Sequence, residues 1–441
     1  NFSMEAIEQT FNGTADFGKK VTCTVSRNGD LIHRIYLQVT LPRVEATVSS
    51  AFFRWVNFIG HFLIKSVEIQ IGGQRIDKQY GDWLTIWNEL TIPTGLKAGY
   101  DNMVGNTVAL TGTGLQRTEA TTLYVPFQFW FCRNPGLSLP LIALQYHEVK
   151  IELEFRPKAE CYVSTGGSLN SCGVSVSGSL DAFCVPSLEY ASLFIDYIYL
   201  DTDERRRFAQ VSHEYLIEQL QFTGDESVNQ TNVKVKLNFN HPCKELVWVV
   251  QLDDAVTQTP SGALVNGRQW FNYTDKIDIT PYAQNDALTM NNILDGVIDT
   301  SPEDIGASNS LTFGIGSDGA SNTGALAGGS TGQEAAGTQA EYGLLSSHNA
   351  MYDTGVNPVV RAKLQLNGHD RFSEREGRYF NLVQPYQHHE NVPAPGVNVY
   401  SFGLKPEEHQ PSGTCNMSRI DNATLHLTLS SLITSSAPAK V

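Results

Sequence analysis

The sequence lacks the features that mark membrane proteins, nucleic-acid-coating proteins and zinc proteins. No apolar run reaches the roughly 18 residues of a membrane-spanning helix, and the first residues do not read as a signal peptide. Basic residues are outnumbered by acidic ones, 31 to 46, for a formal net charge of -15. The chain therefore lacks the basic face that a general DNA- or RNA-coating protein needs.

Cysteine is scarce and scattered. None of the seven cysteines forms a Cys-x-x-Cys pair, which argues against a zinc site. Cys161, Cys172 and Cys184 share a Ser/Gly-rich stretch in which one disulfide could form. Free thiols, in a protein made in a reducing compartment, are the default expectation.

Short segments with period-two alternation dominate the chain, which is typical of β-strands. The clearest run over residues 67–71, 149–155, 233–239 and 425–429. Helical patterns are few and short, the best being Gly81–Leu90 and Asp203–Gln210. Turns rich in Gly, Pro and Asn separate the strands, so the pattern favours a sandwich or barrel.

The same series of segments occurs twice, in the same order. The matches are 69–73 with 364–368, 7–9 with 217–219, 21–25 with 233–239, 31–39 with 246–252, and 147–155 with 419–429. Several matches in register indicate a duplication. We therefore predict two copies of one β domain, 1–210 and 211–441, joined by a linker at about 201–212.

A pair of small residues follows a strand at the same place in both copies. These pairs are Gly72-Gly73 and Asn367-Gly368. A nucleotide-binding loop would not be expected in both copies with Gly72 replaced by Asn367. Gly-Gly and Asn-Gly are favoured in tight turns that need positive φ. We predict structural hairpin turns at both pairs.

Two segments break the symmetry between the copies. The strand pattern is largely lost over about 252–358, and Gly306–Gly343 within it is rich in Gly, Ala, Ser and Thr. Such a stretch is expected to be a long exposed loop. The strand-like segment Ser187–Leu200 has only Ser430–Val441 as its counterpart. The second copy is expected to have a poor last strand or to continue beyond Val441.

No motif in the chain supports catalysis. Gly314–Gly319 fits G-x-G-x-x-G and Gly328–Gly332 fits G-x-S-x-G, but both lie in low-complexity sequence without the strand and helix that these motifs need. The run His388–Glu390 is contiguous, so its side chains cannot all face one metal ion, and a surface loop is expected. We predict no catalytic, metal-binding or cofactor-binding residues.

Longer blocks in both halves carry a family resemblance. They are Ser26–Ile32 (SRNGDLI), Glu68–Lys78 (EIQIGGQRIDK), Asn134–Lys150 (NPGLSLPLIALQYHEVK), His213–Gly224 (HEYLIEQLQFTG), Leu237–Pro242 (LNFNHP) and Gln410–Leu425 (QPSGTCNMSRIDNATL). These blocks closely resemble the major capsid protein of large icosahedral nucleo-cytoplasmic double-stranded DNA viruses. Those of algal viruses of the chlorella-virus kind are the most similar.

The resemblance implies an all-β double jelly roll, two eight-stranded antiparallel β-sandwiches in tandem, with short helices and long loops. It implies a homotrimer that forms a pseudo-hexagonal capsomer and tiles an icosahedral shell, with the loop at about 252–358 on the outer face. The implied partners are neighbouring capsomers, minor capsid, penton and inner-membrane-associated viral proteins, and covalent glycans. Direct contact with nucleic acid is not expected. The implied location is the virion capsid, assembled in the host cytoplasm.

Two other functions are compatible with a duplicated β-sandwich. A carbohydrate-binding module would need an exposed aromatic row, with Trp55 or Trp270 as a stacking platform. A cupin-type enzyme would need a metal triad, which the sequence does not supply.

Asn-x-Ser/Thr sequons occur in both halves and matter only if the chain meets a glycosylating enzyme. The candidates are Asn272, Asn229 and Asn12. Asn272 lies in the long loop and is expected to be the most exposed.

Overall fold

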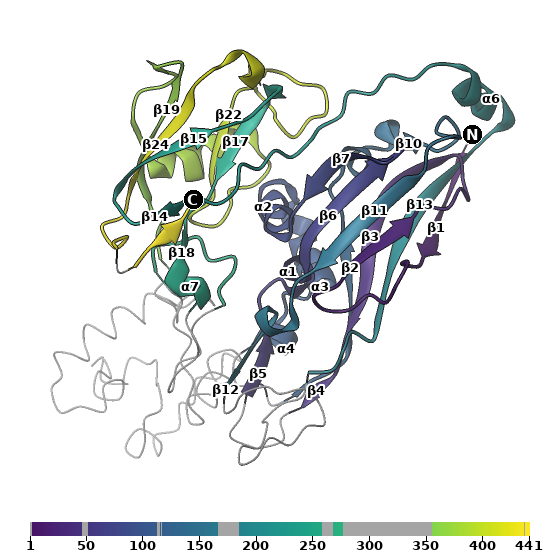
Figure 1. Cartoon of the computed structure of the whole chain (residues 1–441), viewed down its shortest axis with the longest axis horizontal. Helices are drawn as coiled ribbons and strands as arrows, with labels where there is room; N and C mark the ends of the chain where they lie inside the picture. Colours follow the sequence, from purple (N-terminus) through teal and green to yellow (C-terminus); the bar gives the residue numbers. More distant parts are fainter. Residues whose placement is uncertain are drawn as a thin grey trace, which may run out of the picture.

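Two β-rich bodies lie side by side in the computed structural model of the chain (Figure 1). The structure describes residues 2–45, 52–112, 115, 117–165, 185–257, 268–276, 355–435 and 437–441. We call the part from β1 to β13 the N-terminal body and the part from β14 to β25 the C-terminal body. The chain passes from helix α6 (Thr202–Gln210), beside the N-terminus, across to the C-terminal body. No helix in these ranges is long and apolar enough to cross a membrane.

The N-terminal body contains two antiparallel sheets. One has the order β1-β13-β3, with β9 and β10 both paired to β3, and the other has the order β2-β11-β6-β7. The strands are β1 (Phe2–Gln9), β2 (Lys20–Thr24), β3 (Leu31–Leu41), β6 (Ile64–Ile71), β7 (Gln74–Gln79), β9 (Thr121–Pro126), β10 (Leu139–Pro140), β11 (Val149–Phe155) and β13 (Tyr190–Leu200). Shorter pairs join β4 (Val44–Glu45) to β8 (Arg117–Thr118) and β5 (Phe52–Trp55) to β12 (Tyr162–Thr165).

Short helices fill the connections of the N-terminal body. They are α1 (Ile59–Leu63), α2 (Gly81–Thr91), α3 (Lys97–Val104), α4 (Val108–Thr111) and α5 (Trp130–Arg133), with 3₁₀ turns at Thr94–Leu96, Pro135–Leu137 and Lys158–Glu160. The helices α2 and α6 confirm the two amphipathic patterns read from the sequence. Trp87 of α2 is buried, so its indole contributes to the packing.

Strand β11 shows how the alternating pattern builds the core. Its apolar side chains at Val149, Ile151, Leu153 and Phe155 are all buried, while the residues between them are half-buried on the other face. β11 pairs with β2 on one side and β6 on the other, so it is an interior strand of the sheet. The predicted strand is confirmed, and its burial follows from the period of two.

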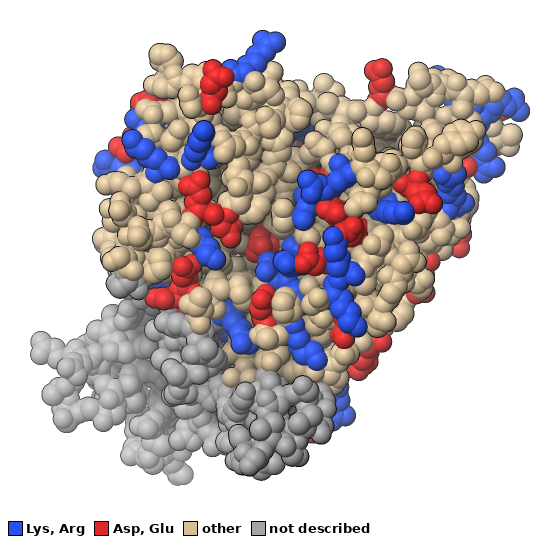
Figure 2. Space-filling model, in the orientation of Figure 1, with Lys and Arg blue, Asp and Glu red and all other residues tan. Residues whose placement is uncertain are grey.

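The outer face of this sheet carries charges of both signs. Lys65 Nζ lies 2.6 Å from Glu154, Lys20 pairs with Glu152, and Gln70 Nε2 donates to Glu152 at 3.1 Å. Figure 2 shows Lys and Arg side chains close to Asp and Glu side chains over this part of the visible face. Opposite charges on neighbouring strands stabilise the pairing and keep one side of the sheet compatible with water.

The C-terminal body repeats the second sheet of the N-terminal body. Its main sheet has the order β15-β24-β19-β20, with β21 also paired to β19, which matches β2-β11-β6-β7. Smaller sheets pair β16 with β23, β17 with β22, and β25 with both β14 and β18. The strands are β14 (Ser227–Val228), β15 (Asn232–Leu237), β16 (Pro242–Cys243), β17 (Glu245–Trp248), β18 (Gln251–Leu252), β19 (Val359–Leu366), β20 (His369–Asp370), β21 (Arg375–Glu376), β22 (Asn398–Ser401), β23 (Cys415–Asn416), β24 (Ala423–Leu429) and β25 (Ala439–Lys440).

Helical turns also connect the strands of the C-terminal body. They are α7 (Asp253–Thr257), a π-helical turn η5 (Tyr379–Val383), α10 (Gln384–His388) and a 3₁₀ turn η6 (Met417–Arg419). The two glycine-rich motif matches, and most of the predicted loop 252–358, lie outside the described residues.

The repeat is incomplete at both ends of the C-terminal body. β1 pairs with β13 along eight residues, whereas residues 213–226, the counterpart of β1, form no strand. In the described part of the chain, only the short β25 follows β24. A strand needs a paired neighbour for its backbone N–H and C=O groups. Residues 213–225 have no such neighbour in the described part of the C-terminal body, and residues 218–220 bond to the N-terminal body instead.

The two small-residue pairs form the tight turns of matching hairpins. Gly72 and Gly73 join β6 to β7 with φ of 59° and 81°, and Asn367 and Gly368 join β19 to β20 with φ of 51° and 80°. Positive φ at both central residues matches the twist of the flanking strands. Asparagine is one of the few residues with a side chain that tolerates this conformation.

Replacing Gly73 isolates the cost of this backbone conformation, because a Cβ at Gly73 would meet no neighbouring atom. We expect Gly73→Ala to lower the free energy of unfolding by about 1–2 kcal/mol, since an L-residue is strained at positive φ. Urea denaturation measures the change. Gly99→Ala in α3 is the matched control, because Gly99 is also unobstructed but has no positive φ. Equal effects of the two substitutions would contradict the assignment.

Candidate functional site

The contact surface between the two bodies is the most elaborate polar and apolar site in the described residues, and we call it the seam. Its apolar part joins Ile86 and Leu90 of α2 to Tyr273, Val397 and Val399 of the C-terminal half. All five side chains are buried. Burial of about 25 cal/mol per Å² of apolar surface makes such a cluster a substantial contribution to the contact.

Aromatic residues extend the seam beside α1. Trp270 stacks on Phe62 with ring centroids 4.8 Å apart, and its indole N–H donates to the carbonyl of Glu160 at 3.1 Å. Phe271 meets the same Phe62 edge-on at 6.1 Å. The guanidinium of Arg156 lies 4.5 Å from the Phe62 ring. Aromatic pairs of this geometry add specificity to the burial of their area.

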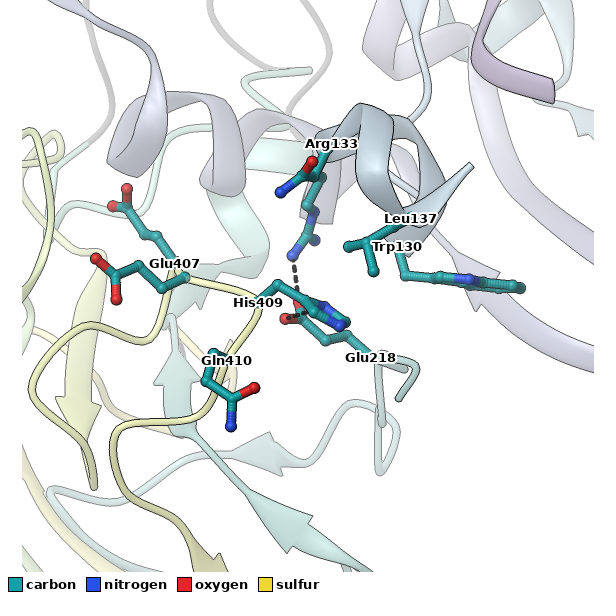
Figure 3. Close-up of a pocket in the computed structure, with 9 residues that line it drawn as sticks. Trp130, Arg133, Leu137, Glu218, Glu407, His409 and Gln410 are labelled. Carbon is teal, nitrogen blue, oxygen red and sulfur yellow. Dashed lines mark hydrogen bonds and ion pairs between the residues drawn. The ribbon is translucent and has the colours of Figure 1, made fainter. Parts of the chain in front are cut away.

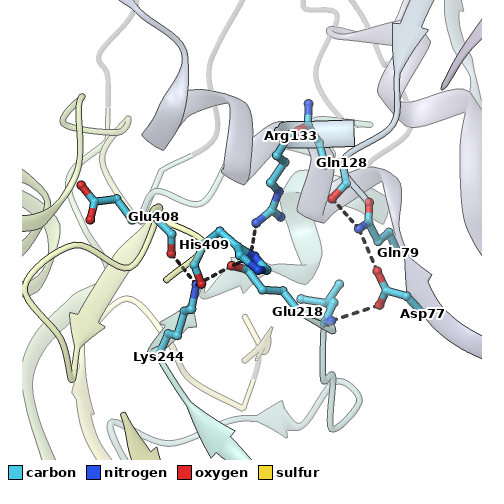
Figure 4. A network of polar contacts seen from close by, with 9 residues as sticks. Asp77, Gln79, Gln128, Arg133, Glu218, Lys244, Glu408 and His409 are labelled. Atoms are coloured by element: carbon cyan, nitrogen blue, oxygen red, sulfur yellow. Dashed lines mark hydrogen bonds and ion pairs between the residues drawn. The ribbon is translucent and has the colours of Figure 1, made fainter. Parts of the chain in front are cut away.

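A charged network also joins the two bodies (Figure 4). We call residues 211–226, between α6 and β14, the crossing segment. Arg133, at the end of α5, places Nη1 2.6 Å from Glu218 of this segment. Lys244, just before β17, also pairs with Glu218 and donates to the carbonyl of Glu408 at 2.6 Å. The guanidinium of Arg133 lies 4.0 Å from the Trp87 ring. One carboxylate is thus shared by a cation from each body.

The crossing segment is also fastened to the edge strand β7. The backbone N–H of Leu220 donates to the Asp77 carboxylate at 3.1 Å, and Gln219 donates to the carbonyl of Ile76. Gln79 donates to the other Asp77 oxygen at 3.0 Å and to the Gln128 carbonyl. Burial raises the pKa of Asp77, and these hydrogen bonds oppose the rise. A polar anchor therefore holds residues 218–220 against the N-terminal body.

A pocket of about 430 Å³ opens beside this network (Figure 3). It is lined by Trp130, Arg133, Asn134, Leu137, Glu218, Glu407, Glu408, His409 and Gln410. Arg133 and Glu218 point toward each other within it, and His409 Nδ1 lies 3.7 Å from Glu218. Arg133 and Glu218, the charges at the centre of the pocket, are already paired with each other. We therefore interpret the pocket as part of the contact between the two bodies and not as a set of free catalytic groups.

His389 corrects the expectation that residues 388–390 form a surface loop. The side chain of His389 is fully buried, with Nε2 2.9 Å from Glu245 and Nδ1 2.7 Å from Glu407. His388 ends α10 and bonds the carbonyl of Leu404. The prediction of a surface loop was wrong because the two neighbouring imidazoles point in different directions. The ring of His389 is buried in the C-terminal body, whereas the ring of His388 stays near the surface.

The protonation of His389 follows from this enclosure. Burial lowers the pKa of the imidazole, but the two carboxylates outweigh burial and raise the pKa to about 9. His389 is therefore an imidazolium near neutral pH, and it joins β17 to the loop that lines the pocket. In the described residues, no group of three His, Cys, Asp or Glu side chains could hold a metal ion.

The remaining predicted residues are dispersed. Asn12 and Asn229 are exposed, whereas Asn272 is only half-buried and its amide donates to Gln269 and to the Lys276 carbonyl. The expectation that Asn272 is the most exposed candidate is therefore wrong. Trp55 is fully buried and Trp270 is stacked in the seam, so neither is an exposed sugar-stacking platform.

These features define a class: a structural protein made of two tandem β domains that are fastened together by a charged and aromatic seam. The chain belongs to the major capsid protein family of large eukaryotic DNA viruses. The family model described as "Major capsid protein N-terminus" matches residues 1–201, and the model described as "Large eukaryotic DNA virus major capsid protein" matches residues 204–440. By this membership it is a structural component of a virion capsid and not an enzyme.

Named relatives and solved structures agree with this membership. The chain is 53% identical to a major capsid protein of Phaeocystis pouchetii virus, over 98% of this chain and 86% of the relative. It is 37% identical to the major capsid protein of Paramecium bursaria Chlorella virus 1, over 100% of this chain and 83% of the relative. The crystal structure of PBCV-1 VP54 is similar with a TM-score of 0.65 and 32% identity, over 100% of this chain and 92% of that one. The double jelly-roll fold implied by the sequence is confirmed.

Loss of the shared carboxylate should loosen the seam. We expect Glu218→Gln to lower the free energy of unfolding by about 2–3 kcal/mol, because Arg133 and Lys244 are then left largely buried without their partner. Urea denaturation measures the loss. The control is Glu45→Gln, which removes a pair with Arg43 in which both side chains are at least half exposed. A loss at Glu45 as large as that at Glu218 would contradict the assignment.

The ion pairs of His389 with Glu245 and Glu407, which we call the His389 clamp, predict a specific pH dependence of stability. Because the folded-state pKa is raised from 6.5 to about 9, the stabilisation is fully present below pH 6.5 and is lost as pH rises through about 9. We expect this loss to approach about 3 kcal/mol. Denaturation from pH 6 to pH 10 should show the loss in the wild type and in the control His388→Gln, but not in His389→Gln. Parallel profiles for the wild type and His389→Gln would refute the clamp.

Proposed function

We propose that the chain assembles as a homotrimer, a capsomer of pseudo-hexagonal outline that tiles the flat facets of an icosahedral shell. The observation that carries the proposal is the matched strand order of the two bodies, β2-β11-β6-β7 and β15-β24-β19-β20, held side by side in one chain. Three copies around a threefold axis present six similar bodies. Closed symmetry of this kind gives a near-sixfold tile from one type of subunit.

The proposed domains are the two halves read from the sequence, 1–210 and 211–441, with a linker at about 201–212. The boundary between the two matching family models, at residues 201 and 204, supports this division. So do the separate apolar cores of the two bodies. A tile needs a fixed angle between its domains, and the seam supplies contacts that oppose relative motion.

An exposed apolar surface supports contact between copies. Leu96, Met103 and Val108 lie on the consecutive short helices after α2, with exposed fractions of 63%, 39% and 68%. Large apolar side chains that are exposed in the single chain are candidates for burial against another molecule. In the proposed trimer this surface is covered by a neighbouring copy of the chain.

The remaining proposed partners are minor capsid, penton and inner-membrane-associated viral proteins, with assembly in the host cytoplasm. The net charge of -15 supports a role that does not include direct contact with nucleic acid. Asn12 and Asn229 are exposed and stay proposed glycosylation sites, together with the partly engaged Asn272.

Native mass tests the proposal. Light scattering on a purified sample at micromolar concentration should give three times 48.6 kDa, and negative-stain images of the same peak should show hexagonal outlines. Val108→Glu should shift the mass toward that of a monomer, because a charge on the apolar surface opposes its burial. The control Thr24→Glu, on an exposed position of β2, should remain a trimer. A monomer of the wild type at this concentration would sink the proposal.

A further inference from the structure

Two cysteines face each other across a pair of short strands in the C-terminal body. Cys243 of β16 and Cys415 of β23 are direct partners in the antiparallel register. Both thiols are free in the structure, and both are half-buried at the edge of the apolar core. They come from segments far apart in the sequence, and no pattern in the sequence connects them.

The register alone satisfies the backbone requirement for a disulfide. Directly opposite residues in an antiparallel pair have Cα atoms about 4.5 or 5.5 Å apart, depending on whether the pair exchanges hydrogen bonds. Disulfides span Cα separations of about 4.4–6.8 Å. Either form of the pair therefore falls within the range that needs no backbone movement. The thiol of Cys243 now donates to the carbonyl of Glu245 at 3.0 Å, a weak bond that a side-chain rotation would exchange for the covalent one.

We propose that Cys243 and Cys415 form a redox-controlled disulfide that closes the C-terminal body. The oxidant is a small-molecule disulfide of the glutathione class. One thiolate attacks the small disulfide, forms a mixed disulfide and releases one small thiol. The second cysteine, after losing its proton, then attacks the mixed disulfide and releases the second small thiol. Overall, two protein thiols are oxidised to one disulfide and one small disulfide is reduced to two thiols.

The surroundings of the two thiols indicate which one reacts first. Burial raises the pKa of Cys243 to about 12, with a further contribution from the Glu245 carboxylate. Burial also raises the pKa of Cys415, but the positive charge of Arg371 opposes the rise. A thiolate is the attacking species, so Cys415 reacts first with the small disulfide and Cys243 then attacks the mixed disulfide.

Other cysteines of the described residues lack this arrangement. Cys23 lies opposite Ile151, not opposite a cysteine, and Cys132 and Cys161 are buried in the N-terminal core. They serve as internal controls, because the same oxidant should leave them as thiols.

The disulfide would enclose the C-terminal part of the seam. The ring runs from Cys243 to Cys415 and contains β17, β19 and β22 together with His389. Closing a long loop restricts the unfolded chain, so the folded body gains stability. Oxidising surroundings outside a cell favour the closed form, and a reducing compartment favours the open one.

Peptide mapping tests the proposal on the whole 441-residue chain. The protein is incubated with oxidised glutathione, blocked with iodoacetamide under denaturing conditions and digested with trypsin without reductant. Cleavage yields Leu237–Lys244, with Cys243 as its one cysteine, and Tyr379–Arg419, with Cys415 as its one cysteine. We expect these two peptides to be joined after oxidation and separate after reduction. Full alkylation of both cysteines after oxidation would overturn the proposal.

A thermal measurement gives a second, independent readout. Oxidation should raise the unfolding midpoint of the wild type by at least about 3 °C, and reduction should reverse the rise. Cys415→Ser should lose both the joined peptide and the rise. An equal rise in Cys415→Ser, or a joined peptide that contains a different cysteine, would overturn the pairing.

Discussion

The arrangement of the two bodies depends on the ion pairs that the carboxylate of Glu218 forms with a cation of each body. The carboxylate accepts from Arg133 of the N-terminal body and from Lys244 of the C-terminal body, and all three side chains are largely buried. Glu218 belongs to the segment 211–226, which crosses between the bodies, so the crossing segment itself supplies the charge that holds them together. A buried charge without its partner is costly, and each member of this trio therefore fixes the position of the other two.

Apolar packing opposes separation of the two bodies, and the paired charges fix their relative position. The aromatic contact of Trp270 with Phe62 and the apolar cluster around α2 resist separation of the bodies. Such surfaces alone would tolerate sliding, because the hydrophobic effect is not directional. The paired charges of Arg133, Glu218 and Lys244 select one arrangement, as the proposed capsomer requires: its outline depends on a constant angle between two domains.

Local sequence patterns predicted the individual strands and their duplication. The period of two in β11 and the Asn367-Gly368 turn both depend on neighbouring residues, so the sequence displays them directly. The seam could not be predicted this way, because Arg133, Glu218 and Lys244 come from three distant segments and each resembles an ordinary surface charge. Long-range pairing likewise explains why Ile7 lies in a strand while the matching Ile217 does not.

The central claim is that the seam holds both bodies as one rigid unit, and a distance distribution measures this most directly. Spin labels, introduced with a genetically encoded residue at Thr24 of β2 and Lys236 of β15, occupy exposed and equivalent positions in the two halves. Samples in which a small fraction of the subunits is labelled restrict the pulsed-resonance signal to pairs within one chain. A rigid seam predicts a single narrow distribution. A broad distribution, or two separate ones, would contradict the account.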